Sequence, residues 1–413
     1  MKKLIYNPAQ ILTINTNGNN LKRGKEQSDV GLLENHSIEI ENGRIKDFIR
    51  TGEAKKESYD EVIDVSNKVI LPGLVECHTH TTFAGSRADE FRMKLEGIDY
   101  EEIAKKGGGI ISTVKAVRQT SFDELVNIAK PRVEYFIEQG ITTLEIKSGY
   151  GLSFFDEIKL LQVIQQLNKI YPIEIIATFL GAHTFPPEYK KDREKYIEII
   201  CDEMIPYVAE NKLAEFCDVF CESTAFSAKE VDRIFNAASK HKLKLKLHTE
   251  QFNNIGGLET AIEHKAISVD HLEVLKIEQI EQLKKSKTIA VLLPGVSFFL
   301  NYDYAPAREL IKNKIPIALA TDYNPGSSHI ANLNFIMSLA ALKMKLSIEE
   351  VITSVTINSA AALSKSKSVG SLEIGKQADF SVFDTYNYAD IVYQVGKNIC
   401  EMTIKDGEVI YRK

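Results

Sequence analysis

Eight short apolar runs recur between residues 67 and 365, and longer stretches with helical periodicity separate most of them. One such stretch, 121–140, begins with the helix-capping type Ser121 and ends at Gly140. Eight strand-helix units over about 300 residues predict a (β/α)₈ TIM barrel of the α/β class, whereas a doubly wound sheet, the alternative, usually has fewer strands. The predicted strands are 73–78, 142–148, 174–183, 217–222, 243–248, 266–271, 289–294 and 315–322.

The two ends of the chain share a different pattern. Residues 37–48 alternate apolar and polar positions around an Asn-Gly pair, and residues 61–65 continue the alternation. Near the C-terminus, 375–384 has the same character and an Asp-Gly pair stands at 406–407. Such pairs favour tight hairpin turns. We therefore expect one small β domain built from residues 1–66 and 366–413, beside a barrel of residues 67–365.

Composition indicates a globular protein and excludes several function classes. Of 413 residues, 44% are hydrophobic and 26% charged, and no apolar run approaches the length of a membrane span or signal peptide. The net charge is -6 and no basic stripe is present, so we expect a small-molecule substrate and neither a nucleic-acid nor a membrane partner. The five cysteines form no C-x-x-C motif, which predicts reduced thiols and a cytoplasmic location.

Histidine and aspartate side chains gather at the C-terminal ends of the predicted strands. In a (β/α)₈ barrel these ends form the face on which catalytic residues lie. We therefore expect the six side chains to share one rim. They are His78 and His80 after the first strand, His183 after the third, His248 after the fifth, His271 after the sixth and Asp322 after the eighth.

The H-x-H pair predicts a metal site. Spacing of two along an extended chain points the rings of His78 and His80 to the same side. With His248 and Asp322 the set becomes three imidazoles and one carboxylate, which suits one Zn²⁺ or Fe ion, divalent or trivalent, with water completing the coordination. The alternative is a group of strand-end histidines that donate only to backbone carbonyls.

Several segments resemble the amidohydrolase superfamily and, within it, the imidazolonepropionase family of histidine degradation. The resemblance implies a metal-bearing barrel, a small β-sandwich made from both termini, and a homodimer. It also implies hydrolysis of the cyclic amide of 4-imidazolone-5-propanoate to N-formimidoyl-L-glutamate by a metal-activated water. The segments are PGLVECHTHTTFAGSRADEF, GGGIISTV, EIKSGYGL, TFLGAHTFPPEY, LHTEQFNNIGG, VDHLE, LLPGVSFFL and ATDYNPGSS.

The resemblance also implies roles for individual residues. Asp322 becomes both a ligand and the general base, and His271 orients the water or polarises the carbonyl. Arg87 suits a carboxylate or ring oxygen, although an ion pair with Asp89 or Glu90 is its alternative. The turn after Asp322 is expected to aim backbone N–H groups at an anion. The substrate-binding residues implied are Arg87, Tyr150, His183, Gln251, Asn324, Gly326 and Ser327.

Gln251 distinguishes the predicted hydrolysis of a cyclic amide from nucleobase deamination, the main alternative. Related nucleobase deaminases carry H-x-x-E after the fifth strand, but here the third residue after His248 is Gln251, whose amide cannot shuttle a proton. Deamination is therefore disfavoured, and a non-catalytic scaffold is disfavoured because all four ligands remain. The fourth strand ends in Glu222 rather than the bridging lysine of binuclear relatives, which predicts one metal per chain.

Strand alternation predicts buried charges beneath the metal. If His78 and His248 face inward, so do Glu76, Lys246 and Lys244. Because unpaired buried charges are costly, these groups require partners. We expect a network that includes Glu76 and Lys246, with the candidate partners Glu145, Lys147 and Glu222.

Overall fold

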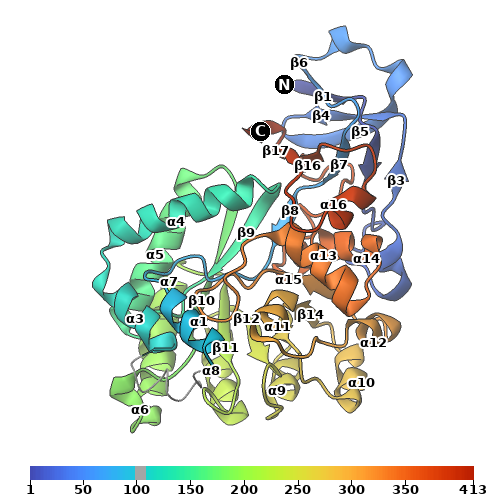
Figure 1. Ribbon diagram of the computed structural model, residues 1–413. Coiled ribbons are helices and arrows are strands. Elements are labelled where there is room, and N and C mark those ends of the chain that lie inside the picture. The colour runs from blue at the N-terminus through green and yellow to red at the C-terminus, as the bar shows by residue number, and fades with distance from the viewer. Residues whose placement is uncertain (98–107) are drawn as a thin grey trace.

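The computed structural model describes residues 1–97 and 108–413, and a parallel barrel lies at its centre (Figure 1). Within these ranges eight strands pair in chain order, and a bridge between Thr79 and Tyr323 joins the last strand to the first. The predicted (β/α)₈ class and all eight predicted strands are confirmed. The barrel strands are β8 (Leu74–Glu76), β9 (Ile141–Lys147), β10 (Glu174–Ala182), β11 (Phe216–Phe220), β12 (Lys244–Thr249), β13 (Ser268–His271), β14 (Ile289–Leu292) and β15 (Ile317–Leu319).

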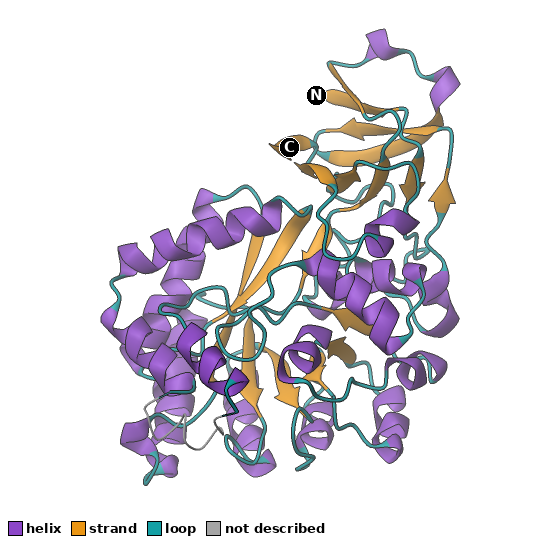
Figure 2. Cartoon of the chain, viewed as in Figure 1, coloured by secondary structure: helices purple, strands orange, loops and turns teal. Residues whose placement is uncertain are grey.

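Helices surround the barrel strands (Figure 2). The predicted boundaries of α4 (Phe122–Ile137) are confirmed, because the Ser121 hydroxyl accepts a hydrogen bond from the Glu124 N–H and Gly140 follows with φ of +92°. Gly107, the first glycine of GGGIISTV, lies outside the described residues.

The described α-helices form two groups along the chain, those before β14 and those after it. The first group is α1 (Ala88–Leu95), α3 (Ile110–Gln119), α4 (Phe122–Ile137), α5 (Phe154–Ile170), α6 (Arg193–Glu198), α7 (Ile205–Glu210), α8 (Ala228–Lys240), α9 (Gly257–Glu263) and α10 (Ile277–Lys285). The second group is α11 (Pro294–Leu300), α12 (Ala307–Lys312), α13 (Leu333–Met344), α14 (Ile348–Ser354), α15 (Ile357–Ala362) and α16 (Ala389–Tyr393). Across the described ranges, none of the helices combines the length and apolar character that a membrane crossing needs.

Two further sheets are built from the ends of the chain, which lie close together in Figure 1: the four-stranded sheet contains N-terminal strands, and the six-stranded sheet combines strands from both ends. Both predicted turns are confirmed, since Asn42 and Gly43 have φ of +52° and +74°, and Asp406 and Gly407 have φ of +51° and +78°. The four-stranded sheet has the order β5 (Arg44–Arg50), β4 (His36–Glu41), β1 (Lys2–Tyr6) and β6 (Glu61–Asp64). The six-stranded sheet has the order β18 (Glu408–Arg412), β17 (Cys400–Lys405), β16 (Phe380–Phe383), β7 (Val69–Pro72), β2 (Gln10–Leu12) and β3 (Leu32–Leu33).

A separate hydrophobic core joins these two sheets into the predicted sandwich. It includes Ile5 and Ile38 from the four-stranded sheet and Ile70 and Phe380 from the six-stranded one, all fully buried. Strand β7 pairs in the six-stranded sheet, and a single residue, Gly73, then leads into barrel strand β8. The division of the chain at residues 66 and 365 stays a prediction.

Candidate metal centre and substrate pocket

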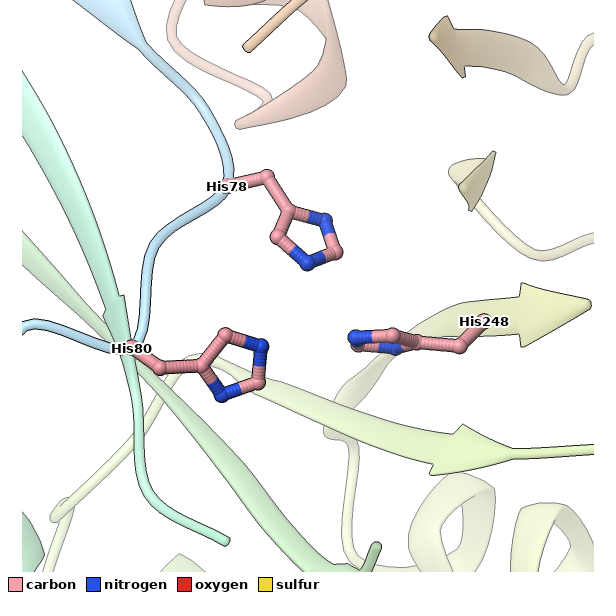
Figure 3. Close-up of side chains that lie close together, drawn as sticks. All are labelled: His78, His80 and His248. Atoms are coloured by element: carbon pink, nitrogen blue, oxygen red, sulfur yellow. The ribbon is translucent and has the colours of Figure 1, made fainter. Parts of the chain in front are cut away.

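Three histidine rings converge at the C-terminal end of the barrel. His78 and His80 follow β8, His248 lies on β12, and one ring nitrogen from each lies within 4.8 Å of the others. Figure 3 shows the rings pointing into a common space from these two segments. All three side chains are buried, with at most 3% exposed.

Buried carboxylates fix the orientation of two of these rings. The Nδ1 atom of His78 lies 2.6 Å from Asp270 Oδ2, and that of His248 lies 3.1 Å from Asp218 Oδ1. A carboxylate accepts the Nδ1 proton, so each ring presents an unprotonated Nε2 atom to the shared space. Burial lowers the pKa of His248 to about 4, against the opposing effect of Asp218, and keeps this ring neutral.

Asp322 is the fourth side chain of this group. Its Oδ1 atom lies 3.4 Å from the Nε2 atoms of both His78 and His80. Burial alone would raise the pKa of Asp322, but the neighbouring rings of His78 and His80 hold it well below its usual value. The residue therefore presents an ionised carboxylate to the three imidazoles.

The donor set fits a metal ion. Within the described chain, His78 Nε2, His248 Nε2 and Asp322 Oδ1 are buried and have no hydrogen-bond partner. Buried polar atoms are normally paired, so three unpaired atoms facing one space indicate a group that binds all of them. Three neutral imidazoles and one carboxylate are the ligands that Zn²⁺ and Fe accept.

His271 reaches the site through an unusual backbone conformation. Asp270 already faces the barrel interior, so regular alternation would turn His271 away from it. Instead, φ is +90° at His271 and +72° at Leu272, and the ring centroid lies 5.4 Å from that of His248. Such positive φ values in residues other than glycine are costly and concentrate at functional sites.

A buried network of charges lies beneath the histidines, as predicted. Lys246 Nζ is 3.0 Å from Glu145 Oε1 and also donates to the Cys77 carbonyl. Lys147 Nζ is 3.0 Å from Glu145, 2.9 Å from Asp218 and 3.9 Å from Asp270. Lys147 therefore lies near both of the aspartates that orient metal-facing rings, and Glu145 links it to Lys246.

Other parts of the network prediction are wrong. Lys244 does not enter the interior: it lies at the start of β12, is 39% exposed and pairs with Glu215. Glu222 lies in the loops above the barrel, where it accepts the Phe252 and Asn253 N–H groups. Glu76 is buried but accepts the N–H groups of His78 and Thr321 instead of contacting a lysine, and burial raises its pKa to about 8.

A cavity of about 1160 Å³ opens above the three rings. Tyr150 and His183 line it together, with ring centroids 5.3 Å apart and 5.6 and 5.3 Å, respectively, from that of His80. His183 Nδ1 donates to the Gly149 carbonyl at 2.9 Å, which leaves its Nε2 as an acceptor. Burial lowers the pKa of His183 well below its usual value, so the ring is neutral.

Arg87 also lines the cavity, and it forms the ion pair with Glu90 that was its alternative, while its contact with substrate stays a prediction. Its Nε atom donates to Glu90 Oε2 at 2.7 Å, while Glu90 Oε1 accepts from Gly109 N and Ser112 Oγ. The pair is not a surface contact, because only 13% of the Arg87 side chain is exposed. Its guanidinium packs against Gly326, where an added Cβ would lie 2.0 Å from Nη1.

The loop after Asp322 differs from its predicted arrangement. The N–H groups of Gly326 and Ser327 both donate to Asn324 Oδ1, at 2.7 and 2.8 Å, and so they are not aimed at an anion. Asn324 Nδ2 donates to the Asp322 carbonyl and to Ser327 Oγ. Asn324 therefore organises the loop from inside, although all three residues line the cavity.

Gln251 lines the same cavity and is 6% exposed. The structure thus brings all the predicted ligands and substrate-binding residues to one end of the barrel. Sequence reasoning missed Asp218 and Asp270, the partners of His248 and His78. Their signal is the general tendency of metal-binding histidines to donate the second ring nitrogen to a carboxylate.

Comparison with known proteins gives consistent results. The sequence model of the Amidohydrolase family matches residues 69–410. Imidazolonepropionase of Flavobacterium johnsoniae is 41% identical over 411 residues, covering 99% of this chain and 100% of that protein. Imidazolonepropionase of Clostridium tetani is 41% identical over 419 residues and covers 100% of both chains.

Solved structures of lower identity share the fold. A guanine deaminase of E. coli is 15% identical with a TM-score of 0.76, covering 100% of this chain and 99% of that chain. An adenosine deaminase from Xanthomonas campestris, solved with bound zinc, is 16% identical with a TM-score of 0.73, covering 98% and 92%. At this identity the likeness concerns the fold alone.

Proposed function

The chain belongs to the imidazolonepropionases of the Amidohydrolase family, enzymes of histidine degradation, and from that premise we propose how its residues perform the hydrolysis. The substrate, 4-imidazolone-5-propanoate, is a small cyclic amide with a carboxylate arm. Opening it to N-formimidoyl-L-glutamate requires an activated water, a polarised carbonyl and a proton for the departing nitrogen.

The single observation that carries the proposal is the convergence of unpaired, buried donor atoms. His78, His80 and His248 would hold one ion through Nε2, and Asp322 would add a carboxylate oxygen. When bound, such an ion lowers the pKa of water and polarises a carbonyl. One Zn²⁺ or Fe ion per chain is proposed, and the zinc in the adenosine deaminase of the same fold supports Zn²⁺.

Asp322 and His271 handle the proton and the developing charge. Asp322 is ionised and faces the metal-facing nitrogens, so it accepts the proton that the attacking water gives up. His271 lies beside His248 and has Glu273 Oε1 3.5 Å from its Nδ1 atom. That carboxylate lies on the Nδ1 side of the ring without a hydrogen bond to it, and Nε2 is the ring atom proposed to face the water or the carbonyl oxygen.

The other cavity residues position the substrate. Arg87 keeps both Nη groups for the propanoate carboxylate, since Glu90 engages only its Nε atom. Tyr150 and His183 contact the imidazolone ring, and Gln251 binds through an amide that cannot act as a base. Asn324 fixes the turn that contains Gly326 and Ser327, which line the cavity beside the Arg87 guanidinium.

Further proposals concern the cellular location, the oligomeric state, the domain boundaries and the partners of the protein. A cytoplasmic location is supported by the five cysteines, all of which are free and buried. A homodimer is proposed from the family resemblance alone. The composite domain is proposed as residues 1–66 with 366–413, supported by the hydrophobic core that Ile5 and Ile38 share with Phe380. The absence of a basic stripe supports the proposal that nucleic acid is not a partner.

The test measures metal content and turnover together. Purified protein is analysed for zinc and iron, and the loss of imidazolone absorbance is followed with and without a chelator. We expect one ion per chain, loss of activity on chelation, and its return when metal is restored. In His248→Ala both metal and turnover should be lost, whereas His36→Ala, in terminal strand β4, should retain both.

A parallel assay addresses deamination. Guanine and cytosine are offered as competing substrates, and ammonia release is measured. We expect none, because Gln251 replaces the proton-shuttling glutamate. Ammonia release without imidazolone turnover, or full activity in the metal-free protein, would contradict the proposed mechanism.

A further inference from the structure

The loop between β9 and α5 carries Tyr150 into the cavity in a strained conformation. Its φ values are +105° at Gly149 and +49° at Leu152, and the second is costly for a side chain of this size. Tyr150 is nevertheless 4% exposed and sits beside the rings of His80 and His183. Other contacts must hold the loop in this shape.

Glu157 binds the N–H groups of this loop. One carboxylate oxygen accepts from Gly149 N at 3.0 Å, and the other accepts from Gly151 N at 2.7 Å and Leu152 N at 2.8 Å. Glu157 is fully buried in the first turn of α5. It is not needed as a helix cap, because Ser153 and Asp156 cap α5 by themselves.

Arg118, on α3, binds the carbonyl groups of the same loop. Its Nε atom donates to the Gly151 carbonyl at 2.8 Å and its Nη2 atom to the Leu152 carbonyl at 2.9 Å. The remaining group, Nη1, lies 2.7 Å from Glu188 Oε1. A carboxylate and a guanidinium from different helices therefore bind the N–H and the carbonyl groups of residues 149–152 in this loop.

We propose that Glu157 and Arg118 are positioning residues that set where Tyr150 meets the substrate. The proposal rests on the substrate-binding role proposed for Tyr150. Neither side chain needs to contact substrate. The Gly149 carbonyl also accepts the His183 Nδ1 proton, so the same loop fixes the orientation of a second ring that faces the substrate.

The test combines kinetics with backbone exchange in the metal-loaded enzyme. Glu157→Gln preserves shape but replaces one acceptor oxygen with a donor, so at least one loop N–H loses its partner. We expect kcat/KM to fall about tenfold, mainly through KM, and loop amides to exchange about tenfold faster. In a Tyr150→Phe background, Glu157→Gln should lower kcat/KM little further, because both substitutions weaken the same interaction of Tyr150 with the substrate.

Glu350→Gln is the matched control. Glu350 is also a buried glutamate in a helix first turn, where it accepts the Ser347 N–H, but α14 is not part of the cavity lining. This control should lower thermal stability and leave kcat/KM and loop exchange unchanged. If Glu157→Gln does not fold, Arg118→Lys is tested by the same measurements. This substitution removes one of the two hydrogen bonds from Arg118 to the loop carbonyls.

Unchanged kcat/KM and loop exchange in a folded Glu157 or Arg118 variant would overturn the proposal. Additive effects of the Glu157 and Tyr150 substitutions on kcat/KM would also overturn it, because they would show that Glu157 has a purely structural role. A Tyr150→Phe enzyme with wild-type kinetics would instead overturn the substrate-binding role of the Tyr150 hydroxyl, while the exchange data would still test whether Glu157 fixes the loop.

Discussion

Gly326 is a residue at which one methyl group should weaken substrate binding. An alanine Cβ would lie 2.0 Å from Arg87 Nη1 and 2.9 Å from Cζ, so the guanidinium must move. Because Arg87 is proposed to hold the substrate carboxylate by paired donors, Gly326→Ala should raise KM about tenfold with a smaller change in kcat. Steady-state kinetics measures both parameters.

The control for this change is Gly52→Ala, because no atom lies within 4 Å of the Cβ that it would add. It should leave KM unchanged. Wild-type KM in a folded Gly326→Ala enzyme would show that Arg87 can shift without loss and would count against its proposed role.

Single residues of the site divide into those that sequence can reveal and those that it cannot. His78 and His80 stand out because their spacing and strand-end position are local properties of the chain. Glu157 and Asp218 do not, because their roles depend on partners brought together only by folding. Asn324 was predicted to bind substrate; the structure shows that it lines the cavity and that its side chain accepts the loop N–H groups.

At the scale of elements, Lys147 connects three barrel strands through the interior. From β9 it pairs with Asp218 on β11 and approaches Asp270 on β13. Lys147→Met would leave both aspartates without this cation, and losing one partner of a buried pair costs about 3–5 kcal/mol. Since the same aspartates orient His248 and His78, zinc affinity should also fall about 10–100-fold.

Chemical denaturation and zinc competition with a chelator measure these two effects. Lys244→Met is the matched control, because Lys244 is partly exposed and contacts neither aspartate. Its free energy of unfolding should change by no more than about 0.5 kcal/mol. Unaltered zinc affinity in Lys147→Met would show that the aspartates hold the rings without the lysine.

The positions of the strands and hairpin turns agreed closely with those predicted from the sequence. Buried parallel strands appear as short apolar runs and hairpins as alternation around Asn-Gly or Asp-Gly, so both were predictable. Alternation failed at strand ends for two physical reasons. Lys244 lies at the starting end of β12, where solvent reaches it, and His271 changes direction through a positive φ that no local pattern indicates.

At the scale of the whole molecule, the terminal sheets form part of the barrel floor. Ser381 on β16 donates to the Gly140 carbonyl at 2.6 Å and accepts the Leu74 N–H at 3.1 Å. Thr403 on β17 donates to the Ile137 carbonyl at 2.6 Å. These contacts join the C-terminal strands to the starting ends of β8 and β9, and so we expect both parts to unfold together.

Ser381→Ala tests this expectation. The change removes the two hydrogen bonds of the Ser381 hydroxyl, but the Leu74 N–H still donates to the Gly140 carbonyl at 2.9 Å, so the free energy of unfolding should fall by about 0.5–1.5 kcal/mol. If the sheets and barrel are one cooperative unit, hydrogen exchange in β16 and in β12 should accelerate equally, whereas the exposed change Ser58→Ala should affect neither. Faster exchange confined to the terminal sheets would show that the barrel is stable without them.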